Sequence, residues 1–248
     1  MKRMITGMAV VILLSLLPLT SQAGETMDYT VNGVTYEGYG EKAVGPSKGL
    51  VIIVHDWDGL TDYEIKRASM LSEMGYDAFA LDLYGKGNRP DTTSAKKAET
   101  GKLYNDRAAM RARLLGGLEK ARMFSSGKVA VMGYCFGGAA VLELARSGKA
   151  KNIAGYATFH GGLATPDGQS YPNDTPPLLI AHGGADTSIT MAHVAELSQT
   201  LEKTGINYEI QVYSGAPHAF TVIGSGCYQK VADEQSWSAF ADFLKANL

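Results

Sequence analysis

Three residues of this chain have the side chains and the chain order that nucleophilic catalysis requires. Cys135 lies in a glycine-rich hexapeptide, and Asp186 and His218 follow it in loops that come after strand-like runs. A thiol needs a base to take its proton, and the base needs a third group to orient it. Histidine suits this task because its pKa lies near neutral pH. We predict Cys135 as nucleophile, His218 as general base and then acid, and Asp186 as the orienting carboxylate; a helix-capping role for Asp186 is the alternative.

The hexapeptide Gly-Tyr-Cys-Phe-Gly-Gly at 133–138 joins an apolar, strand-like run at 128–132 to a helix-forming stretch at 139–145. A strand that turns into a helix within a few residues leaves room only for small flanking residues, which Gly133 and Gly137 provide. This arrangement resembles the nucleophile elbow of α/β-hydrolases, with cysteine in place of serine. A helix N-terminus beneath the thiol favours the thiolate. The alternative is a glycine-rich turn that holds an inert, buried cysteine.

The run at 50–54 is an expected central strand, and the residues after it complete the predicted site. In this fold the corresponding loop supplies the second oxyanion donor, so we predict a hole formed by the backbone N–H groups of Trp57 and Phe136. Asp56 is expected to reach Cys135 and to oppose its ionisation, because a neighbouring negative charge disfavours a thiolate. A simple turn role for Asp56 is the alternative.

The order of strand-like and helix-like segments predicts the fold. Apolar runs alternate with helical stretches, and a hairpin is expected around Asn32-Gly33; one continuous helical region is expected to carry Met110, Leu114, Leu118 and Ala121. This alternation indicates parallel βαβ units, and therefore a single-domain α/β fold with a mostly parallel, doubly wound sheet and helices on both faces. Ligands bind such sheets at the carboxyl ends of the strands, where the candidate residues cluster.

The chain has 248 residues, a formal net charge of −2 and 45% hydrophobic residues, which is enough for one large core. This charge excludes the basic footprint of a nucleic-acid-binding protein. Lys2 and Arg3, an apolar run at 10–17 and a small-x-small site at 21–23 form the pattern of a signal peptide. We predict that residues 1–23 are cleaved, that residues 24–248 form the domain, and that it is exported to the periplasm without membrane association; an uncleaved anchor is the alternative.

The motifs resemble those of the dienelactone hydrolase family over about residues 28–247. The most specific segments are Val-His-Asp-Trp-Asp-Gly-Leu at 54–60, Asp-Leu-Tyr-Gly at 82–85, the hexapeptide at 133–138, His-Gly-Gly-Ala-Asp at 182–186 and Pro-His-Ala-Phe at 217–220. The resemblance implies a compact α/β-hydrolase without a large cap and with a Cys–His–Asp triad. It implies hydrolysis of small esters or lactones through an acyl-thioester, with no cofactor and no metal. The expected partner is therefore a small-molecule ester or lactone.

Two positions depart from the family pattern. The acidic residue after the first core strand is usually glutamate, and here it is Asp56. Of two arginines that hold the substrate carboxylate in the family's lactonases, one falls at Lys86 and the other near Val222. Lys86 can supply a point charge but not the two-pronged contact of arginine. The residues expected to modulate the thiol or bind substrate are Asp56, Tyr84, Lys86 and Phe220. The candidates for an apolar pocket wall are Trp57, Tyr84 and Phe220.

Two other functions are compatible with the sequence. One is a non-catalytic protein that binds a small ligand and retains the hydrolase fold. The other is a thiol redox protein, which a disulfide between Cys135 and Cys227 would favour, although the chain has no C-x-x-C motif. Oligomeric state and natural substrate do not follow from the sequence.

Overall fold

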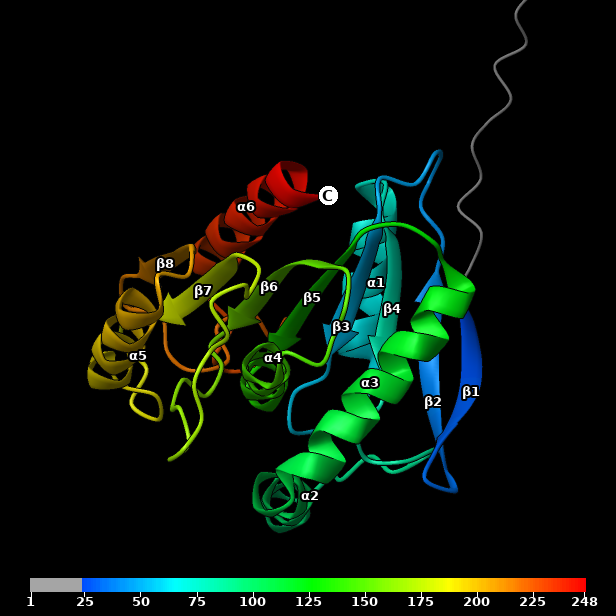
Figure 1. The fold of residues 1–248 in the computed structure, drawn as a ribbon, viewed down its shortest axis with the longest axis horizontal. Coiled ribbons are helices and arrows are strands. Elements are labelled where there is room, and N and C mark those ends of the chain that lie inside the picture. Colours follow the sequence, from blue (N-terminus) through cyan, green and yellow to red (C-terminus); the bar gives the residue numbers. More distant parts are fainter. Residues whose placement is uncertain (1–23) are drawn as a thin grey trace, which may run out of the picture.

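The computed structural model describes residues 24–248, in which one β-sheet lies between two layers of helices (Figure 1). The signal peptide predicted over residues 1–23 lies outside the described residues. The strands are β1 (Glu25–Val31), β2 (Val34–Glu41), β3 (Leu50–Val54), β4 (Asp77–Leu81), β5 (Val129–Tyr134), β6 (Ile153–Phe159), β7 (Leu178–Gly183) and β8 (Tyr208–Tyr213). The helices are α1 (Asp62–Glu73), α2 (Thr93–Asn105), α3 (Arg107–Phe124), α4 (Phe136–Ser147), α5 (Met191–Thr204) and α6 (Lys230–Asn247).

The strands form a single sheet in the order β1-β2-β4-β3-β5-β6-β7-β8. Strands β3 to β8 pair in parallel, and β1 and β2 add an antiparallel hairpin at one edge. Asn32 and Gly33 turn this hairpin with φ values of 50° and 80°, and these positive angles suit a two-residue hairpin loop. The predicted mostly parallel, doubly wound α/β sheet is confirmed.

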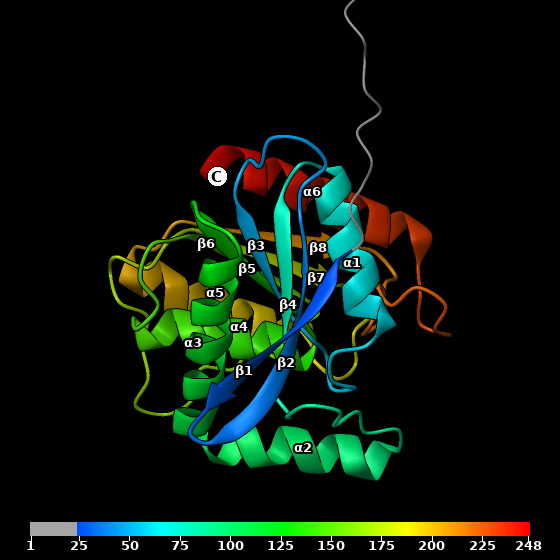
Figure 2. The same cartoon turned by 90° about the vertical axis from the view of Figure 1, so that its right-hand side faces the viewer.

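Both faces of the sheet are buried, and β3 shows how one strand serves two cores. Leu50, Ile52 and Val54 point into one hydrophobic cluster, whereas Val51 and Ile53 point into the other. Helices α3, α4 and α5 cover the first face, and α1 and α6 cover the second (Figure 2). An unbroken apolar run is the expected sequence for such a strand, because alternate side chains enter different cores.

Helix ends follow the signals in the sequence. The side chain of Glu64 accepts a hydrogen bond from the Thr61 backbone N–H at 2.8 Å, which forms the capping box that begins α1. Gly148 and Gly205 end α4 and α5 in the left-handed conformation, with φ values of 59° and 68°. Such precise ends matter because α4 begins at the predicted nucleophile.

The predicted apolar stripe of Met110, Leu114, Leu118 and Ala121 lies in one helix, α3, and is buried as expected, while a separate helix, α2, precedes it. Asp106 leaves the helical conformation (φ −124°, ψ 78°) and accepts a hydrogen bond from the Ala109 N–H at 2.9 Å. Aspartate at a helix N-cap favours such a break because its side chain replaces a missing backbone partner. Helix α2 is thereby free to lie beyond the carboxyl ends of the strands (Figure 1).

Within residues 24–248, no helix combines the length and apolar character needed to cross a bilayer.

Candidate active site

Cys135 lies between β5 and α4 in a backbone conformation that few residues adopt. Its φ is 49° and its ψ is −111°, which is strained for a residue with a Cβ atom. Glycines on both sides allow this turn. A Cβ atom on Gly133 would lie 2.4 Å from the Gly137 carbonyl, and one on Gly137 would lie 2.2 Å from the Val54 carbonyl oxygen. The sharp bend raises the sulfur above the carboxyl ends of the strands.

The structure brings the three predicted triad residues together from separate loops. The Cys135 Sγ lies 3.1 Å from the His218 Nε2, and the His218 Nδ1 lies 2.8 Å from the Asp186 Oδ2. The other oxygen of Asp186 accepts hydrogen bonds from the backbone N–H groups of Ser188 and Ile189 at 2.8 and 2.9 Å. Asp186 is therefore anchored by its own loop and orients the histidine ring toward the sulfur.

Charge interactions within this triad favour a protonated His218. Burial alone would lower the pKa of His218, but hydrogen bonds to Asp186 and Cys135 outweigh it and raise the pKa to about 10. Burial would raise the pKa of Asp186, yet its bonds to His218 and to the Ile189 N–H lower it overall. At neutral pH the Asp186 carboxylate therefore faces an imidazolium, which has a proton to give.

Two backbone N–H groups are available beside Cys135 for an oxyanion. Phe136 is the first residue of α4, and Trp57 lies in the loop after β3; neither N–H has an acceptor within residues 24–248. The close contact of Gly137 with the carbonyl oxygens of Val54 and His55 brings these two segments together. The predicted pair of donors therefore belongs to two segments in direct contact, and both donors are unoccupied.

Asp56 and Glu64 form a carboxyl pair under this loop. The Asp56 N–H points to the Glu64 Oε1 at 3.5 Å, and Asp56 Oδ1 accepts a hydrogen bond from the Asp58 N–H at 2.8 Å. Burial raises the pKa of both carboxyls, and the charge of Asp56 raises that of Glu64 further. The positive charge of His218 lowers the pKa of Asp56 in part, but among the described residues the Asp56 carboxylate accepts no hydrogen bond from the Cys135 thiol. Glu64 comes from the first turn of α1, and its place beside Asp56 was not predicted.

Aromatic rings enclose one side of the nucleophile. The ring of Phe136 packs against Tyr84 at 5.8 Å and edge-on against Tyr104 at 5.4 Å, and the Tyr84 hydroxyl donates to the Trp57 carbonyl at 3.2 Å. Tyr104 comes from α2, which sequence reasoning had not connected with the site. Burial and the nearby Cys135 raise the pKa of Tyr104 to about 12.

A cavity of about 190 Å³ adjoins this wall. Its lining includes Tyr104, Arg107, Ala139 from the first turn of α4, Gly162 and Ile189. Ile189 belongs to the loop that holds Asp186, but Cys135, His218 and Asp186 are not among the residues that line the cavity.

Comparison with known proteins agrees with this geometry. The model of the dienelactone hydrolase family matches residues 36–248. The chain belongs to the dienelactone hydrolase family. It is 27% identical over 225 residues to a carboxymethylenebutenolidase of Pseudomonas putida, covering 85% of this chain and 93% of that protein. It is 27% identical over 241 residues to Protein usf of Aquifex pyrophilus, covering 91% and 99%.

Among solved structures, a dienelactone hydrolase-like promiscuous phosphotriesterase from metagenomic libraries has a TM-score of 0.83 with this chain. The two are 25% identical, and the match covers 92% of this chain and 99% of the other. A dienelactone hydrolase from Klebsiella pneumoniae, at 21% identity and a TM-score of 0.76, shares the fold. The α/β-hydrolase architecture expected from the sequence is therefore confirmed.

Two residues expected at the substrate site of this dienelactone hydrolase family member lie elsewhere. Phe220 is completely buried in the second core and packs against His160, so it does not line an open pocket. Lys86 is half exposed beside the β1–β2 hairpin, where its Nζ lies 2.5 Å from the Asp28 carboxylate. Loop positions of this kind depend on how distant segments pack, which a local motif does not specify.

Cations that approach the site loops include Lys96, whose Nζ lies 2.6 Å from the Asp58 carboxylate and 5.4 Å from the centre of the Trp57 ring, and Arg89. Its guanidinium donates to the Glu37 carboxylate at 2.7 Å and to the Leu60 carbonyl, and it lies 3.7 Å from Asp82. Asp82 itself accepts hydrogen bonds from the Tyr84 and Gly85 N–H groups, as expected for a residue that ends a strand. Arg89 is thus occupied by protein groups and ties the loops together.

His160, which directly follows β6, lies behind the triad. Its Nε2 is 2.8 Å from the Thr221 Oγ1, and its ring contacts the His218 ring edge-on at 5.3 Å. Burial keeps the pKa of His160 well below its ordinary value. A neutral ring in this place supports His218 without competing for its proton.

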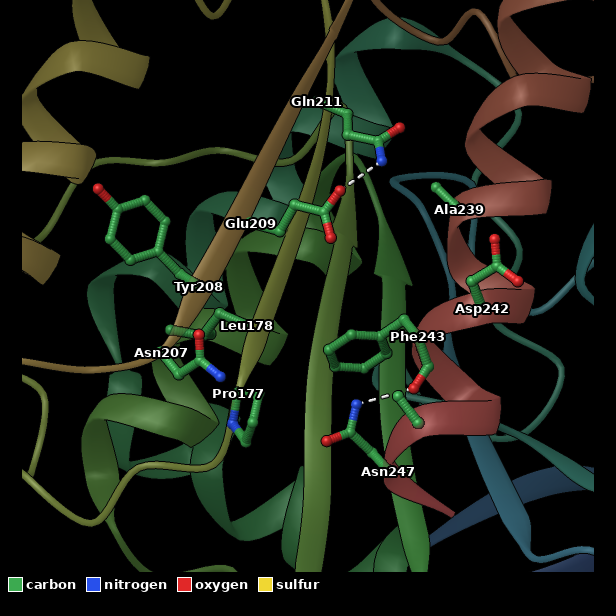
Figure 3. A pocket seen from close by; sticks show the side chains of 11 residues that line it. Pro177, Leu178, Asn207, Tyr208, Glu209, Gln211, Ala239, Asp242, Phe243 and Asn247 are labelled. Atoms are coloured by element: carbon green, nitrogen blue, oxygen red, sulfur yellow. Dashed lines mark hydrogen bonds between the residues drawn. The ribbon is translucent and has the colours of Figure 1, made fainter.

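Other features of the family member lie away from this chemistry. Cys135 and Cys227 are both free, and Cys227 is exposed in a loop. A cavity of about 620 Å³ lies at the amino ends of β7 and β8, beside Phe243 and Asn247 of α6 and far from the loops of the triad (Figure 3). Among residues 24–248, no group of three or more histidine, cysteine, aspartate or glutamate side chains could hold a metal ion.

Proposed function

We propose that this protein hydrolyses small carboxylic esters or lactones, with Cys135 as the nucleophile. The observation that carries the proposal is the continuous chain of contacts from the Asp186 carboxylate through the His218 ring to the Cys135 sulfur. Membership of the dienelactone hydrolase family supports ester or lactone hydrolysis, as does the name of the Pseudomonas putida relative.

Acylation begins with the proton of the Cys135–His218 pair on the imidazole, as the raised pKa of His218 favours. The sulfur attacks the substrate carbonyl carbon, an S–C bond forms, and the carbonyl π electrons move to oxygen. The N–H groups of Trp57 and Phe136 stabilise this oxyanion. When the oxyanion collapses, the ester C–O bond breaks and His218 gives its proton to the leaving oxygen, which leaves an acyl-thioester on Cys135.

Deacylation uses the same residues in the reverse sense. His218, now neutral, takes a proton from water, and the resulting hydroxide attacks the thioester carbon. A second oxyanion occupies the same two N–H groups. Its collapse breaks the C–S bond, releases the carboxylic acid and restores the sulfur beside a protonated His218. Asp186 keeps the ring orientation constant through both stages.

Cys135→Ala tests the nucleophile. Turnover of an activated aryl ester should fall by about 10⁴-fold or more, because the residues of a triad act as a unit. The melting temperature should stay close to that of the wild type, since within residues 24–248 the thiol has no hydrogen-bond partner other than His218. A Cys227→Ala variant is the matched control and should keep full turnover. Retained turnover in Cys135→Ala would remove cysteine dependence from the proposal.

Alkylation separates this enzyme from a ligand-binding relative that has lost catalysis. Iodoacetamide should label Cys135 faster than Cys227 although Cys227 is exposed and Cys135 is partly buried, because His218 Nε2 lies 3.1 Å from the Cys135 sulfur and can accept the thiol proton as the sulfur reacts. Equal labelling rates at the two cysteines would instead favour a non-catalytic protein.

A further inference from the structure

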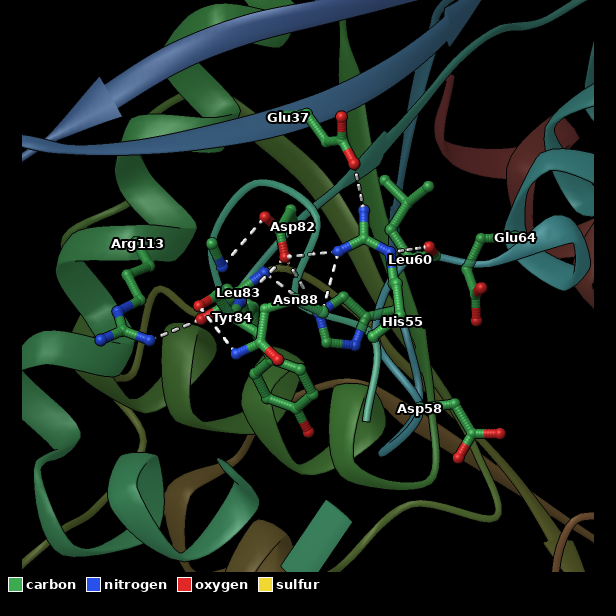
Figure 4. Close-up of polar contacts among 12 residues, drawn as sticks. Glu37, His55, Asp58, Leu60, Glu64, Asp82, Leu83, Tyr84, Asn88 and Arg113 are labelled. Atoms are coloured by element: carbon green, nitrogen blue, oxygen red, sulfur yellow. Dashed lines mark hydrogen bonds and ion pairs between the residues drawn. The ribbon is translucent and has the colours of Figure 1, made fainter. Parts of the chain in front are cut away.

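His55 is a fully buried histidine beside the site, and the reaction described above does not use it. It follows β3 directly, and its ring lies between the loop after β3 and the loop after β4. Figure 4 shows it in the same polar cluster as Asp82, Leu83 and Tyr84. Burying a histidine side chain is unfavourable in free energy unless both ring nitrogens have hydrogen-bond partners, so the partners of His55 indicate its role.

The partners of His55 fix which ring nitrogen carries the proton. The Leu83 N–H donates to Nε2 at 3.0 Å, so Nε2 must be the acceptor. Nδ1 therefore carries the proton, and it lies 2.6 Å from the Asp56 carbonyl oxygen. Burial lowers the pKa of His55 to about 4, so the ring keeps this neutral tautomer at neutral pH.

The hydrogen bond to the Asp56 carbonyl also fixes the Trp57 N–H. The two groups are opposite ends of one peptide unit, which is trans like every peptide bond in residues 24–248. A trans peptide is planar, and its C=O and N–H point in opposite directions. Holding the oxygen of Asp56 on the His55 side therefore directs the Trp57 N–H away from His55, and that N–H has no acceptor in the described part of the chain.

The same ring also contacts the second donor segment. The His55 ring packs edge-on against Tyr84 at 4.7 Å, and its centroid lies 6.3 Å from that of Phe136. These contacts restrict rotation of the imidazole and tie the loop after β3 to the first residue of α4. One side chain thus links both halves of the predicted oxyanion hole.

We propose that His55 is a positioning residue that holds the Asp56–Trp57 peptide so that the Trp57 N–H points at the developing oxyanion. The proposal rests on the proposed acyl transfer at Cys135 and names the residue that prepares its second donor. His55 does not touch the substrate. It acts through one hydrogen bond to a carbonyl oxygen, and a preorganised donor of this kind stabilises charge without reorganising during the reaction.

Two substitutions of His55 each preserve one of its two hydrogen bonds and remove the other. In His55→Asn the amide nitrogen is as many bonds from Cα as Nδ1, so it can still donate to the Asp56 carbonyl. In His55→Gln the amide reaches the position of Nε2, so it can accept from the Leu83 N–H but no longer holds Asp56. Both variants keep a polar, neutral side chain, and their melting temperatures establish that each one folds.

Two reactions of Cys135 then distinguish positioning from packing. Alkylation by iodoacetamide forms no oxyanion, whereas an aryl trifluoromethyl ketone forms a hemithioketal: the sulfur bonds to the carbonyl carbon and the oxygen becomes an oxyanion. In His55→Gln, kcat on an aryl ester and affinity for the ketone should both fall about 10-fold to 100-fold. In His55→Gln the alkylation rate and KM should change less than about threefold. His55→Asn should keep most of the kcat that His55→Gln loses. Equal losses in both variants, or a matching loss of alkylation, would overturn the proposal.

A direct view of the donor comes from ¹⁵N-tryptophan labelling, because the chain has two tryptophans. In the wild type the Trp57 amide signal should shift when the ketone adduct forms, while that of Trp237 in α6 should not. In His55→Gln the Trp57 shift should be lost. If the wild type forms no adduct at Cys135, the proposed nucleophile is wrong. If it forms the adduct without moving the Trp57 signal, the nucleophile stands and the role of His55 falls.

Discussion

At the scale of single residues, the carboxylate of Asp186 decides the charge state of the site. One oxygen contacts His218, and the other is held by the N–H groups of Ser188 and Ile189. An asparagine could keep the second set of contacts through its carbonyl oxygen, because that oxygen also accepts hydrogen bonds. Asp186→Asn therefore removes the charge while the loop is retained.

We expect Asp186→Asn to lower kcat for an aryl ester by about 10⁴-fold, because the ring loses both its orienting charge and its correct proton arrangement. Steady-state kinetics of the wild type and Asp186→Asn measure this loss of kcat, and equal melting temperatures show that the variant is folded. Asp174→Asn, which changes an aspartate in the loop between β6 and β7, is the matched control and should retain wild-type kinetics. A loss of less than tenfold would mean that Asp186 is not the orienting group.

The raised pKa of His218 makes stability depend on pH. The folded pKa, about 10, lies above the ordinary value of about 6.5. A group with a raised folded pKa binds its proton more tightly when folded, so its stabilisation is fully present below about pH 6.5. It is lost as the pH rises through about 10. Melting temperatures from pH 6 to 10 should fall more steeply in the wild type than in Asp186→Asn or His218→Gln; parallel curves would contradict this.

The triad could be predicted from sequence because each member follows a strand-like run, and the order Cys135, Asp186, His218 is that of the fold. The residues around it were predicted in part: Trp57, Phe136 and Tyr84 were expected beside it, and His55 lies in the motif at 54–60. Glu64 and Tyr104 come from α1 and α2, and no local pattern indicates which distant loop such a side chain will meet. Phe220 was misplaced for the same reason: its motif predicts proximity to His218, but the packing turns its ring into the core.

At the scale of elements, the contact between α4 and β3 positions the nucleophile. Gly137 has no side chain because the Val54 carbonyl oxygen occupies the place where its Cβ would be. Strands, caps and helix ends were readable from apolar runs and glycines. The division at Asp106 was not, since aspartate is also tolerated within helices and only its bond to Ala109 marks the break.

Gly137→Ala should lower the free energy of unfolding by about 3 kcal/mol, since backbone atoms 2.2 Å from the new methyl group cannot move without separating α4 from β3. Gly101→Ala, in α2, is the matched control: nothing lies within 4 Å of the added methyl group. That variant should gain about 0.5–1 kcal/mol, because alanine is the better helix former. Urea denaturation of both variants measures the difference, and equal stabilities would refute the close contact.

At the scale of the whole molecule, one sheet collects residues that are far apart in the chain at a single edge. Parallel pairing from β3 to β8 places all these carboxyl ends on the same side. The alternation of apolar runs and helical stretches was sufficient to predict that architecture. The location of the cavity was not predictable, because α2 lines it through Tyr104 and only the folded chain places α2 there.

Export remains a prediction for the whole chain. We expect the protein recovered from a periplasmic fraction to begin at Gly24, because the small-x-small pattern at 21–23 matches a signal peptidase site. Intact-mass measurement of the purified protein checks this, with an Ala23→Arg variant as the control that should remain uncleaved. Recovery of the full-length chain from the cytosol would contradict export.

The bend at Cys135 has a cost that appears in the stability of the entire fold. A non-glycine residue with a φ of 49° is held there by its neighbours against its own preference. The free energy of unfolding of Cys135→Gly should therefore be about 1 kcal/mol higher than that of the wild type. This figure already allows for the greater conformational entropy of glycine in the unfolded chain. Thermal and urea melts would reveal it. The proposed nucleophile therefore occupies a position where glycine is expected to be more stable, as happens where a side chain is retained for its chemistry and not for its contribution to stability.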